Sequence, residues 1–198
     1  MIGVVVIVIA IAIGVPLGAI SGYLGGWVDE VIMRITDVFM TVPALLLAMA
    51  MAAALGAGML NAMIAIALVW WPGYTRLIRA QVLSLRERDF IEAGRALGAS
   101  RWHIIFRHVI PNVISPVIIK ASLDMGFAIL VTAGLGYIGV GVQAPTPEWG
   151  VMISEGRAFL REAWWISVFP GLGMFITVLG FNLLGDGLRD IFDPNARG

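Results

Sequence analysis

Long stretches without a charged side chain are the feature that most restricts how this chain can fold. Four of them cover residues 1–28, 38–75, 125–147 and 163–185. A helix needs about 20 apolar residues to cross a hydrocarbon core about 30 Å thick, so each stretch is long enough for a membrane span. The second can hold two helices, because the turn-rich segment 56–61 divides it. The sequence therefore predicts five spans: residues 2–22, 33–55 and 61–82, a fourth from near Asn112 into the third stretch, and residues 163–185.

The composition excludes most soluble functions. Hydrophobic residues make up 60% of the chain and charged residues 13%, against about 25% charged in an average soluble domain. The 13 basic and 13 acidic side chains cancel, so no net charge favours nucleic acid as a partner. The absence of Cys excludes disulfides and Cys nucleophiles, and two His leave few metal ligands. No basic segment precedes the first apolar stretch, so we do not interpret it as a cleaved signal peptide.

The distribution of arginine predicts the orientation. Seven of the 13 basic side chains lie between the third and fourth spans, at Arg76, Arg79, Arg86, Arg88, Arg95, Arg101 and Arg107. Short cytoplasmic loops carry an excess of basic residues, so this loop is expected to be cytoplasmic. The turn at 56–61 and the segment 143–163 then face outward, and the loop 23–29 and the C-terminal tail face the cytoplasm. An uncharged external N-terminus is an unusual start, so we expect an upstream helix to be missing.

The arginine-rich loop predicts two short helices. Asp89 can cap the first, with Glu92 in the position of a capping box, and Gly98 ends it. Ser100 can cap the second, which Pro111 terminates.

The first of these helices has a narrow apolar stripe. Phe90, Ala93 and Leu97 fall at i, i+3 and i+7, flanked by Glu92 and Arg95. Such a helix can lie on lipid or dock in the groove of a partner. The alternative from these residues alone is a solvated loop helix.

The order of residues in this loop resembles the cytoplasmic signature of binding-protein-dependent ABC importer permeases, Glu-Ala-Ala-x3-Gly-x9-Ile-x-Leu-Pro. Glu92, Ala93, Gly98 and Pro111 match it, while Gly94 stands in place of the second Ala, His108 in place of the Ile and Ile110 in place of the Leu. Further segments resemble the C-type permease subunit of dipeptide, oligopeptide and nickel importers. They are Arg34-x2-Asp37-x5-Pro43, Trp71-Pro-Gly-Tyr-Thr-Arg76, Phe106-Arg-His-Val-Ile-Pro-Asn112, Pro145-Thr-Pro-Glu-Trp-Gly150 and Asn182-Leu-Leu-Gly-Asp-Gly-Leu-Arg-Asp190.

The resemblance implies an all-α fold. It would be a polytopic membrane helix bundle of about five transmembrane helices, like a type I ABC importer permease, formed by residues 1–198 as a single domain. A short coupling helix would lie in the cytoplasmic loop at about 84–111. The family usually has six spans, with a helix and an external segment before the point where this chain starts, which agrees with the expected N-terminal truncation.

The resemblance also implies a function and a set of partners. The coupling helix of the family docks in a cleft on a cytoplasmic ATPase, and the residues expected to do so here are Asp89, Glu92, Ala93, Gly94, Arg95, Leu97, Gly98 and Pro111. The chain would work with a homologous second permease, two ATPase subunits, an external solute-binding protein and the lipid bilayer of a bacterial-type cytoplasmic membrane. It would import peptides or a related small solute by alternating access and would not be an enzyme. The sequence has no Gly-x4-Gly-Lys-Ser/Thr phosphate loop, so we expect ATP and Mg to bind the partner ATPases and no cofactor to bind this chain.

Four charged residues within or beside the spans are candidates for a pathway or gate. Lys120 and Asp124 are four apart on a predicted helix and can pair, although Lys120 could instead extend to the interface. Arg34 and Asp37, three apart, are expected to form a structural ion pair. Pro16, Pro43 and Pro72 are candidate kinks within the spans.

Two other function classes remain as alternatives. A secondary transporter or channel without ATPase partners is expected to hold acidic or His relays at the bilayer midplane, where only Lys120 and Asp124 come close. An intramembrane enzyme needs catalytic side chains within the spans, and neither His lies in one. The pattern Gly-x-Gly-x-x-Gly at 134–139 is better explained by helix packing than by a dinucleotide, as is Gly14-x3-Gly18-x3-Gly22. His103 and His108 are five apart, off the i, i+4 spacing of two ligands on one α-helical face.

Overall fold

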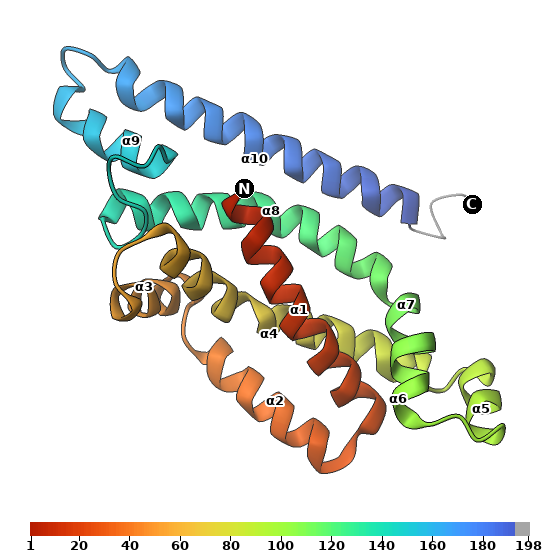
Figure 1. Cartoon of the computed structure of the whole chain (residues 1–198). Helices are drawn as coiled ribbons and strands as arrows, with labels where there is room; N and C mark the ends of the chain where they lie inside the picture. Colours follow the sequence, from red (N-terminus) through yellow and green to blue (C-terminus); the bar gives the residue numbers. More distant parts are fainter. Residues whose placement is uncertain (193–198) are drawn as a thin grey trace. The chain divides into compact units, whose positions relative to one another are not determined.

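The computed structural model describes residues 1–192, and these residues contain helices and no strand. Figure 1 shows the helices in chain order. The α-helices are α1 (Ile2–Leu24), α2 (Gly26–Thr41), α3 (Ala44–Leu55), α4 (Met59–Leu85), α5 (Asp89–Ala96), α6 (Arg101–Ile104), α7 (Ile110–Asn112), α8 (Ile114–Ile138), α9 (Trp149–Gly156) and α10 (Trp165–Phe192). A π-helix, η1 (Ile105–Val109), joins α6 to α7, and a 3-10 helix, η2 (Arg157–Phe159), follows α9. The all-α prediction is confirmed.

Three of the five predicted spans agree with long apolar helices. Three helices in residues 1–192 are long and apolar enough to cross a membrane, namely α1, α8 and α10. Helices α2 and α3 are long and apolar enough to cross a membrane only when taken together, and the chain bends by 89° between them. Helix α4 has 27 residues, enough to cross, but the charged Arg76 and Arg79 lie in its second half. The expected cytoplasmic tail falls on residues 193–198, which lie outside the described part of the chain.

The predicted span at 33–55 is wrong as a single helix. Its first part belongs to α2, which already begins at Gly26, and its second part is α3. Val42 and Pro43 between them have extended backbone, with ψ angles of 135° and 128°. Proline offers no N–H to a helix and disfavours helical geometry in the residue before it, so the helix ends here. Pro16 and Pro72, in contrast, lie inside the continuous helices α1 and α4.

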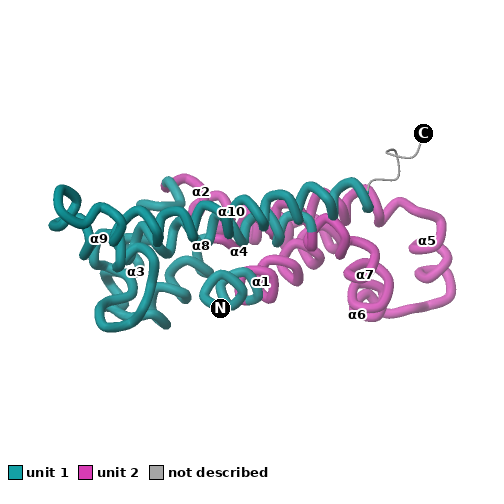
Figure 2. The backbone as a smooth tube through the Cα atoms, turned by 90° about the horizontal axis from the view of Figure 1, so that it is seen from above, with its two compact units in different colours: residues 1–8, 43–69, 119–198 teal, residues 9–42, 70–118 magenta. Residues whose placement is uncertain are grey.

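Two compact units are distinguished in Figure 2. Unit 1 contains residues 1–8, 43–69 and 119–198, and unit 2 contains residues 9–42 and 70–118. The expected single membrane domain stays a prediction. Each unit is described by itself below.

Unit 2 is packed around glycines of α1. A Cβ atom on Gly14 would lie 2.6 Å from the carbonyl oxygen of Trp71, and one on Gly18 would lie 2.5 Å from that of Thr75. A Cβ on Gly22 would come within 2.9 Å of the Cβ of Val82. The three glycines therefore bring the backbones of α1 and α4 together, as the small-residue spacing predicts.

In unit 1 the segment 145–150 has a structural role at each of its last three residues. Glu148 caps α9, because its Oε2 accepts a hydrogen bond of 3.0 Å from the N–H of Val151. The ring of Trp149 lies against Gly173 of α10. Gly150 crosses α8 so closely that a Cβ would overlap the backbone of Ala133. The helix α9 that results lies in the segment expected to face outward and was not predicted.

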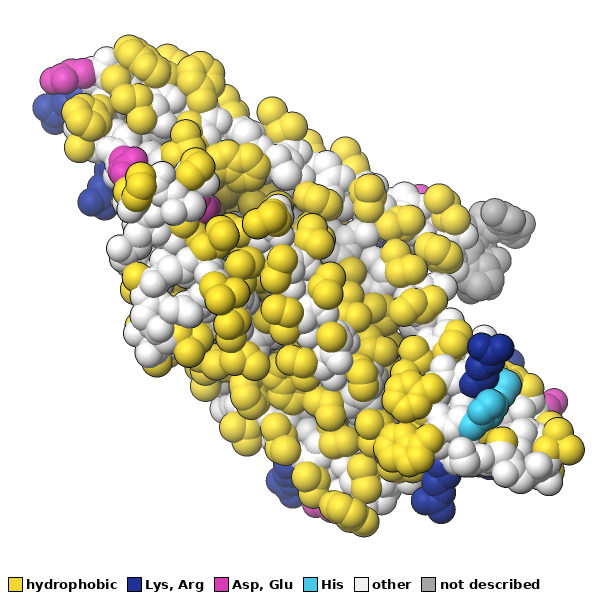
Figure 3. Space-filling model, viewed as in Figure 1, with side chains coloured by type: hydrophobic (Ala, Val, Ile, Leu, Met, Phe, Trp, Pro, Cys, Tyr) yellow, Lys and Arg dark blue, Asp and Glu magenta, His cyan; other side chains and the backbone are white. Residues whose placement is uncertain are grey.

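Hydrophobic side chains cover most of the surface seen in Figure 3. On α10 exposed apolar side chains occur along the whole length of the helix, at Trp165, Ile166, Val168, Phe169, Leu172, Phe175, Ile176, Leu179, Leu183, Leu184, Ile191 and Phe192. Such a surface suits hydrocarbon rather than water. Lys, Arg and His side chains gather instead over α5 and α6, and a second charged group lies at the turn between α9 and α10.

Candidate functional site

The loop helix α5 ends as the sequence predicts. Gly98 has a φ of +80°, which favours glycine. Its N–H donates to the carbonyl of Arg95 at 2.9 Å, and the N–H of Ala99 donates to the carbonyl of Gly94 at 3.1 Å. These two bonds make a Schellman motif, which satisfies carbonyls that the end of a helix leaves without a donor.

The start of α5 differs from the prediction. Arg88 is the capping residue, and no side chain in that position accepts a hydrogen bond. Asp89 is therefore the first residue of the helix rather than its cap, and the expected capping box with Glu92 does not form. Both carboxylates still lie in the first turn, where the helix dipole favours negative charge.

Helix α5 has two different faces. Phe90, Ala93 and Leu97 are exposed, and 88% of the Leu97 surface is accessible. We call these three residues, with Asp89 and Glu92 at their edge, the outer face of α5. Ile91 on the opposite side is 1% exposed and anchors the helix in unit 2. The predicted apolar stripe is thus present, and the core of unit 2 does not cover it.

The inner side of α5 contacts the last turn of α1. The Nε of Arg95 donates to the hydroxyl of Tyr23 at 3.1 Å, and its guanidinium carbon lies 5.0 Å from the centre of the Tyr23 ring. Arg86, just after α4, donates to the carbonyl of Gly22 at 3.3 Å. Two cations therefore lie at the C-terminus of α1, where the helix dipole favours positive charge. Arg95 was expected with the docking residues, and the structure directs its guanidinium to α1.

The second helix of the loop begins as predicted and ends later. Ser100 accepts a hydrogen bond of 3.2 Å from the N–H of His103 and caps α6. Pro111 does not terminate the helix, which widens into η1 and continues through α7 to Asn112. Pro111 lies in the first turn of α7, where its missing N–H is tolerated. It is therefore on a different helix from the other predicted docking residues.

The π-helix changes the relation of the two His. Their ring centres are 5.6 Å apart, although five residues separate them in the sequence. The i, i+4 spacing rule for an α-helical face does not describe this segment, because a π-helix has a longer turn. No group of three His, Asp or Glu side chains that could hold a metal occurs in residues 1–192.

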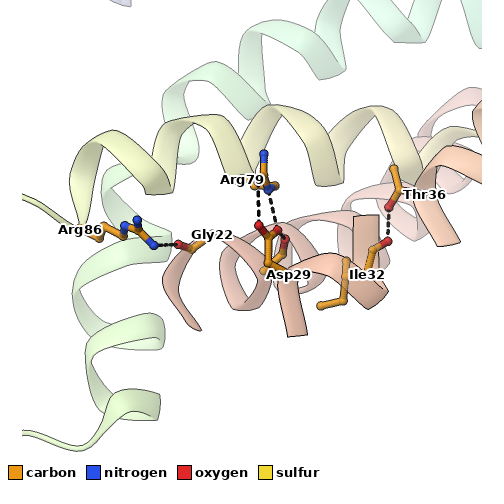
Figure 4. Close-up of polar contacts among 7 residues, drawn as sticks. Gly22, Asp29, Ile32, Thr36, Arg79 and Arg86 are labelled. Atoms are coloured by element: carbon orange, nitrogen blue, oxygen red, sulfur yellow. Dashed lines mark hydrogen bonds and ion pairs between the residues drawn. The ribbon is translucent and has the colours of Figure 1, made fainter. Parts of the chain in front are cut away.

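Ion pairs join α2 to α4 within unit 2. Figure 4 shows Arg79 of α4 directed toward Asp29 of α2. Arg79 donates to both carboxylate oxygens, at 2.6 and 2.7 Å, and the hydroxyl of Ser21 from α1 donates to the same carboxylate. A second and more exposed pair joins Asp37 to Arg76 at 2.6 Å.

Arg34 and Asp37 do not pair as expected. Arg34 lies 3.7 Å from Glu30, its neighbour at i−4, and both side chains are largely exposed. Asp37 is held by Arg76 of α4 instead. The i, i+3 spacing on α2 brings the two groups to one side, but these other partners are better placed.

Lys120 and Asp124 pair on α8, in unit 1. The Nζ of Lys120 lies 3.0 Å from Oδ2 and 3.2 Å from Oδ1 of Asp124. The side chains are 31% and 16% exposed. The predicted pairing is confirmed, and a role in the pathway stays a prediction.

Three residues that hold the loop were not predicted to do so. Ile91 directly follows Phe90 of the apolar stripe. The sequence pattern that could have identified it is an aliphatic residue four positions before Arg95, on the same inner side of the helix. Tyr23 and Arg86 lie at helix ends, and their contacts join residues 72 and 64 positions apart. No local pattern in the sequence could identify such contacts.

Residues 14–198 match the model of the family described as "Binding-protein-dependent transport system inner membrane component". The chain is 50% identical over 196 residues to the probable D,D-dipeptide transport system permease protein DdpC of Escherichia coli (strain K12), covering 99% of this chain and 66% of that protein. It is 49% identical over 181 residues to the dipeptide transport system permease protein DppC of Alkalihalophilus pseudofirmus, covering 91% of this chain and 60% of the relative.

A third relative is the glutathione transport system permease protein GsiD of Pectobacterium atrosepticum, 42% identical over 195 residues, covering 98% of this chain and 65% of the relative. The chain thus spans 60 to 66% of the length of these three relatives. Its fold is similar to a chain in inward-facing conformations of the MetNI methionine ABC transporter. The TM-score is 0.74 at 18% identity, covering 97% of this chain and 92% of the other.

Proposed function

The chain belongs to the family of binding-protein-dependent transport system inner membrane components, and we propose that it is a transmembrane permease subunit of an ATP-driven importer. Its cargo would be peptides or a related small solute. The names of three relatives, which share 42 to 50% identity with this chain, refer to transport of D,D-dipeptides, dipeptides and glutathione. All three are small peptides or peptide-like solutes.

The observation that carries this proposal is the outer face of α5. An eight-residue helix is anchored in unit 2 through Ile91 and presents Phe90, Ala93 and Leu97 outward. Exposed apolar side chains on a helix outside the long spans suit the groove of a partner protein. The partner proposed for this face is a cytoplasmic ATPase subunit, which would bind the ATP and Mg.

The full assembly we propose contains this chain, a homologous second permease, two ATPase subunits and an external solute-binding protein. It would lie in a bacterial-type inner membrane, with α5 on the cytoplasmic side. Closure of the ATPases would push on α5, and the spans would change between inward-facing and outward-facing arrangements. This chain would itself make and break no covalent bond. Lys120, Asp124, Arg34 and Asp37 are the proposed pathway or gate residues, since charged side chains within spans usually face protein or water.

A secondary transporter or channel is less well supported as an alternative. The relatives named above are transport system permeases of the same family, and a partner-independent channel gives no reason for an exposed apolar face on α5.

Uptake by the reconstituted complex tests the proposal. The protein is co-expressed with a homologous second permease, the ATPase subunits and the binding protein from the same genome, and the complex is placed in proteoliposomes. Dipeptide uptake should require ATP on the side of the membrane where the ATPase subunits lie. It should stop when the ATPase subunits are left out. Uptake driven by an ion gradient in their absence would support the alternative.

A variant on the outer face tests the docking step. Leu97→Glu should abolish co-purification of the ATPase subunits. Leu160→Glu is the matched control, since Leu160 is also an exposed leucine, 48% accessible, but lies in the segment expected to face outward. Equal loss in both variants would argue against α5 as the docking helix.

A further inference from the structure

The last turn of α1 is the meeting point of three separate contacts in unit 2. The hydroxyl of Ser21 donates to Asp29 at the start of α2. The carbonyl of Gly22 accepts from Arg86, which follows α4. The hydroxyl of Tyr23 accepts from Arg95 of α5. Each of the three consecutive residues therefore joins α1 to a different part of the unit.

A cleft separates α5 from this turn. Its volume is about 680 Å³, and it is lined by Tyr23, Leu24, Arg86, Glu87, Glu92 and Arg95, among others. The packing between α5 and the end of α1 is therefore open rather than continuous. Arg95 reaches Tyr23 from the α5 side of the cleft and makes a polar contact between the two helices.

The Tyr23–Arg95 contact is specific in geometry. Tyr23 is 7% exposed, and the hydroxyl of a buried tyrosine normally requires a hydrogen-bond partner. Arg95 gives it an N–H donor and also lies over its ring, with 5.0 Å between guanidinium carbon and ring centre. Lysine can supply the charge but not the planar group with a fixed Nε donor.

We propose that Tyr23 and Arg95 are positioning residues that transmit movement of α5 to the end of α1. Displacement of α5 pulls on Arg95, which moves the last turn of α1. Asp29 and Arg79 then carry the movement to α2 and α4, because they connect to the same turn through Ser21. This inference rests on the proposed function, in which the ATPase moves α5.

The test compares transport coupling with docking in the complete complex, reconstituted with its binding protein and a dipeptide. Tyr23→Phe removes the hydroxyl and keeps the ring, and Arg95→Lys keeps the charge. Each should lower the ratio of stimulated to basal ATP hydrolysis by about tenfold, the lower end of the effect expected when one hydrogen bond to a charged group is lost. ATPase co-purification should be retained in Tyr23→Phe. The double variant should lose no more than the worse single variant, because both remove one contact.

Arg107→Lys is the matched control, an exposed arginine of the same loop that should keep the wild-type ratio. Wild-type ratios in Tyr23→Phe and Arg95→Lys would overturn the proposal. Loss of ATPase co-purification or of membrane abundance in Tyr23→Phe would overturn it too, since the contact would then serve docking or folding. If the wild-type complex itself showed no stimulation by binding protein and dipeptide, the proposed function would fail before the contact was tested.

Discussion

Arg79 donates two hydrogen bonds, of 2.6 and 2.7 Å, from its Nε and one terminal nitrogen to the two carboxylate oxygens of Asp29. The pair joins the start of α2 to the second half of α4, and 19% of the Asp29 side chain is exposed. Two-point geometry and partial burial distinguish it from the pair of Asp37 and Arg76, in which the Asp37 side chain is 53% exposed. The two pairs should therefore contribute different amounts to the free energy of unfolding.

Asp29→Asn should lower the free energy of unfolding by about 2 kcal/mol, because Arg79 loses a charged partner in a partly buried place. Asp37→Asn should cost at most about 1 kcal/mol, as is typical of exposed pairs. Thermal unfolding of the purified protein in detergent measures both. Adding Arg79→Gln to Asp29→Asn should cost less than the sum of the single losses. Equal losses at Asp29 and Asp37 would contradict the ranking.

Gly18→Ala should destabilise the protein by about 1–3 kcal/mol, because the new Cβ would lie 2.5 Å from the carbonyl oxygen of Thr75. Gly180→Ala on α10 is the control, since its Cβ would meet no atom within 4 Å. That change should be neutral or stabilise the helix by roughly 0.5–1 kcal/mol. The same detergent unfolding assay serves, and a tolerant Gly18 would show that α1 and α4 can separate without loss.

Lys120→Met and Asp124→Asn should each cost more than the two changes together, because either alone leaves a charge without its partner on α8. The interaction energy from the double-mutant cycle should be about 0.5–3 kcal/mol. Stability in detergent and uptake in proteoliposomes are measured in parallel. Strictly additive losses would favour independent side chains and the alternative in which Lys120 extends to the interface.

Gly98→Val should uncouple the ATPase through the backbone alone. No atom lies within 4 Å of a Cβ at this position, so the side chain has room, but the φ of +80° is strained for a β-branched residue. Gly98→Asn is the control, since Asn adopts positive φ more readily. Glu92→Ala should weaken docking modestly, by about 0–1 kcal/mol. Co-purification and stimulated ATP hydrolysis are the measurements, and wild-type behaviour of Gly98→Val would mean withdrawing the role of α5.

Single cysteines test the orientation, and the native chain supplies none to interfere. Ala99→Cys, between α5 and α6, should react with an impermeant thiol reagent only from the cytoplasmic side. Thr146→Cys, exposed in the loop before α9, should react only from outside. Labelling of Ala99→Cys in intact cells would reverse the orientation proposed for the whole chain.

Sequence reasoning located features that depend on local chemistry. The charge-free stretches predicted α1, α8 and α10, and Gly98 was identified as a helix end because only one type of residue adopts its backbone conformation readily. The break at Pro43 was expected as a kink within one span, but a missing N–H does not tell by itself whether a helix bends or ends. The capping box at Asp89 failed by one residue, because neighbouring positions compete for the start of a short helix.

Contacts between distant segments were beyond the same reasoning. Arg34 and Asp37 have suitable spacing for a pair, yet Arg76, 39 residues from Asp37, is the partner that α4 provides. Tyr23 and Arg95 meet because glycines bring α1 against α4 and because the short turn after α4 places α5 beside the end of α1. The candidate docking face could therefore be predicted from the sequence of one helix. The residues that hold this helix in place could be identified only from the folded unit.

The burial of Ile91 beneath an exposed Phe90, Ala93 and Leu97 separates two sets of evolutionary constraint on one short helix. Residues on the inner side must fit this subunit, while those on the outer face need fit only whatever binds there. The outer residues can therefore change together with a partner while Ile91, Arg95 and Gly98 stay as they are. Exchange of the outer face alone between related subunits should transfer partner choice and leave the rest of the protein undisturbed.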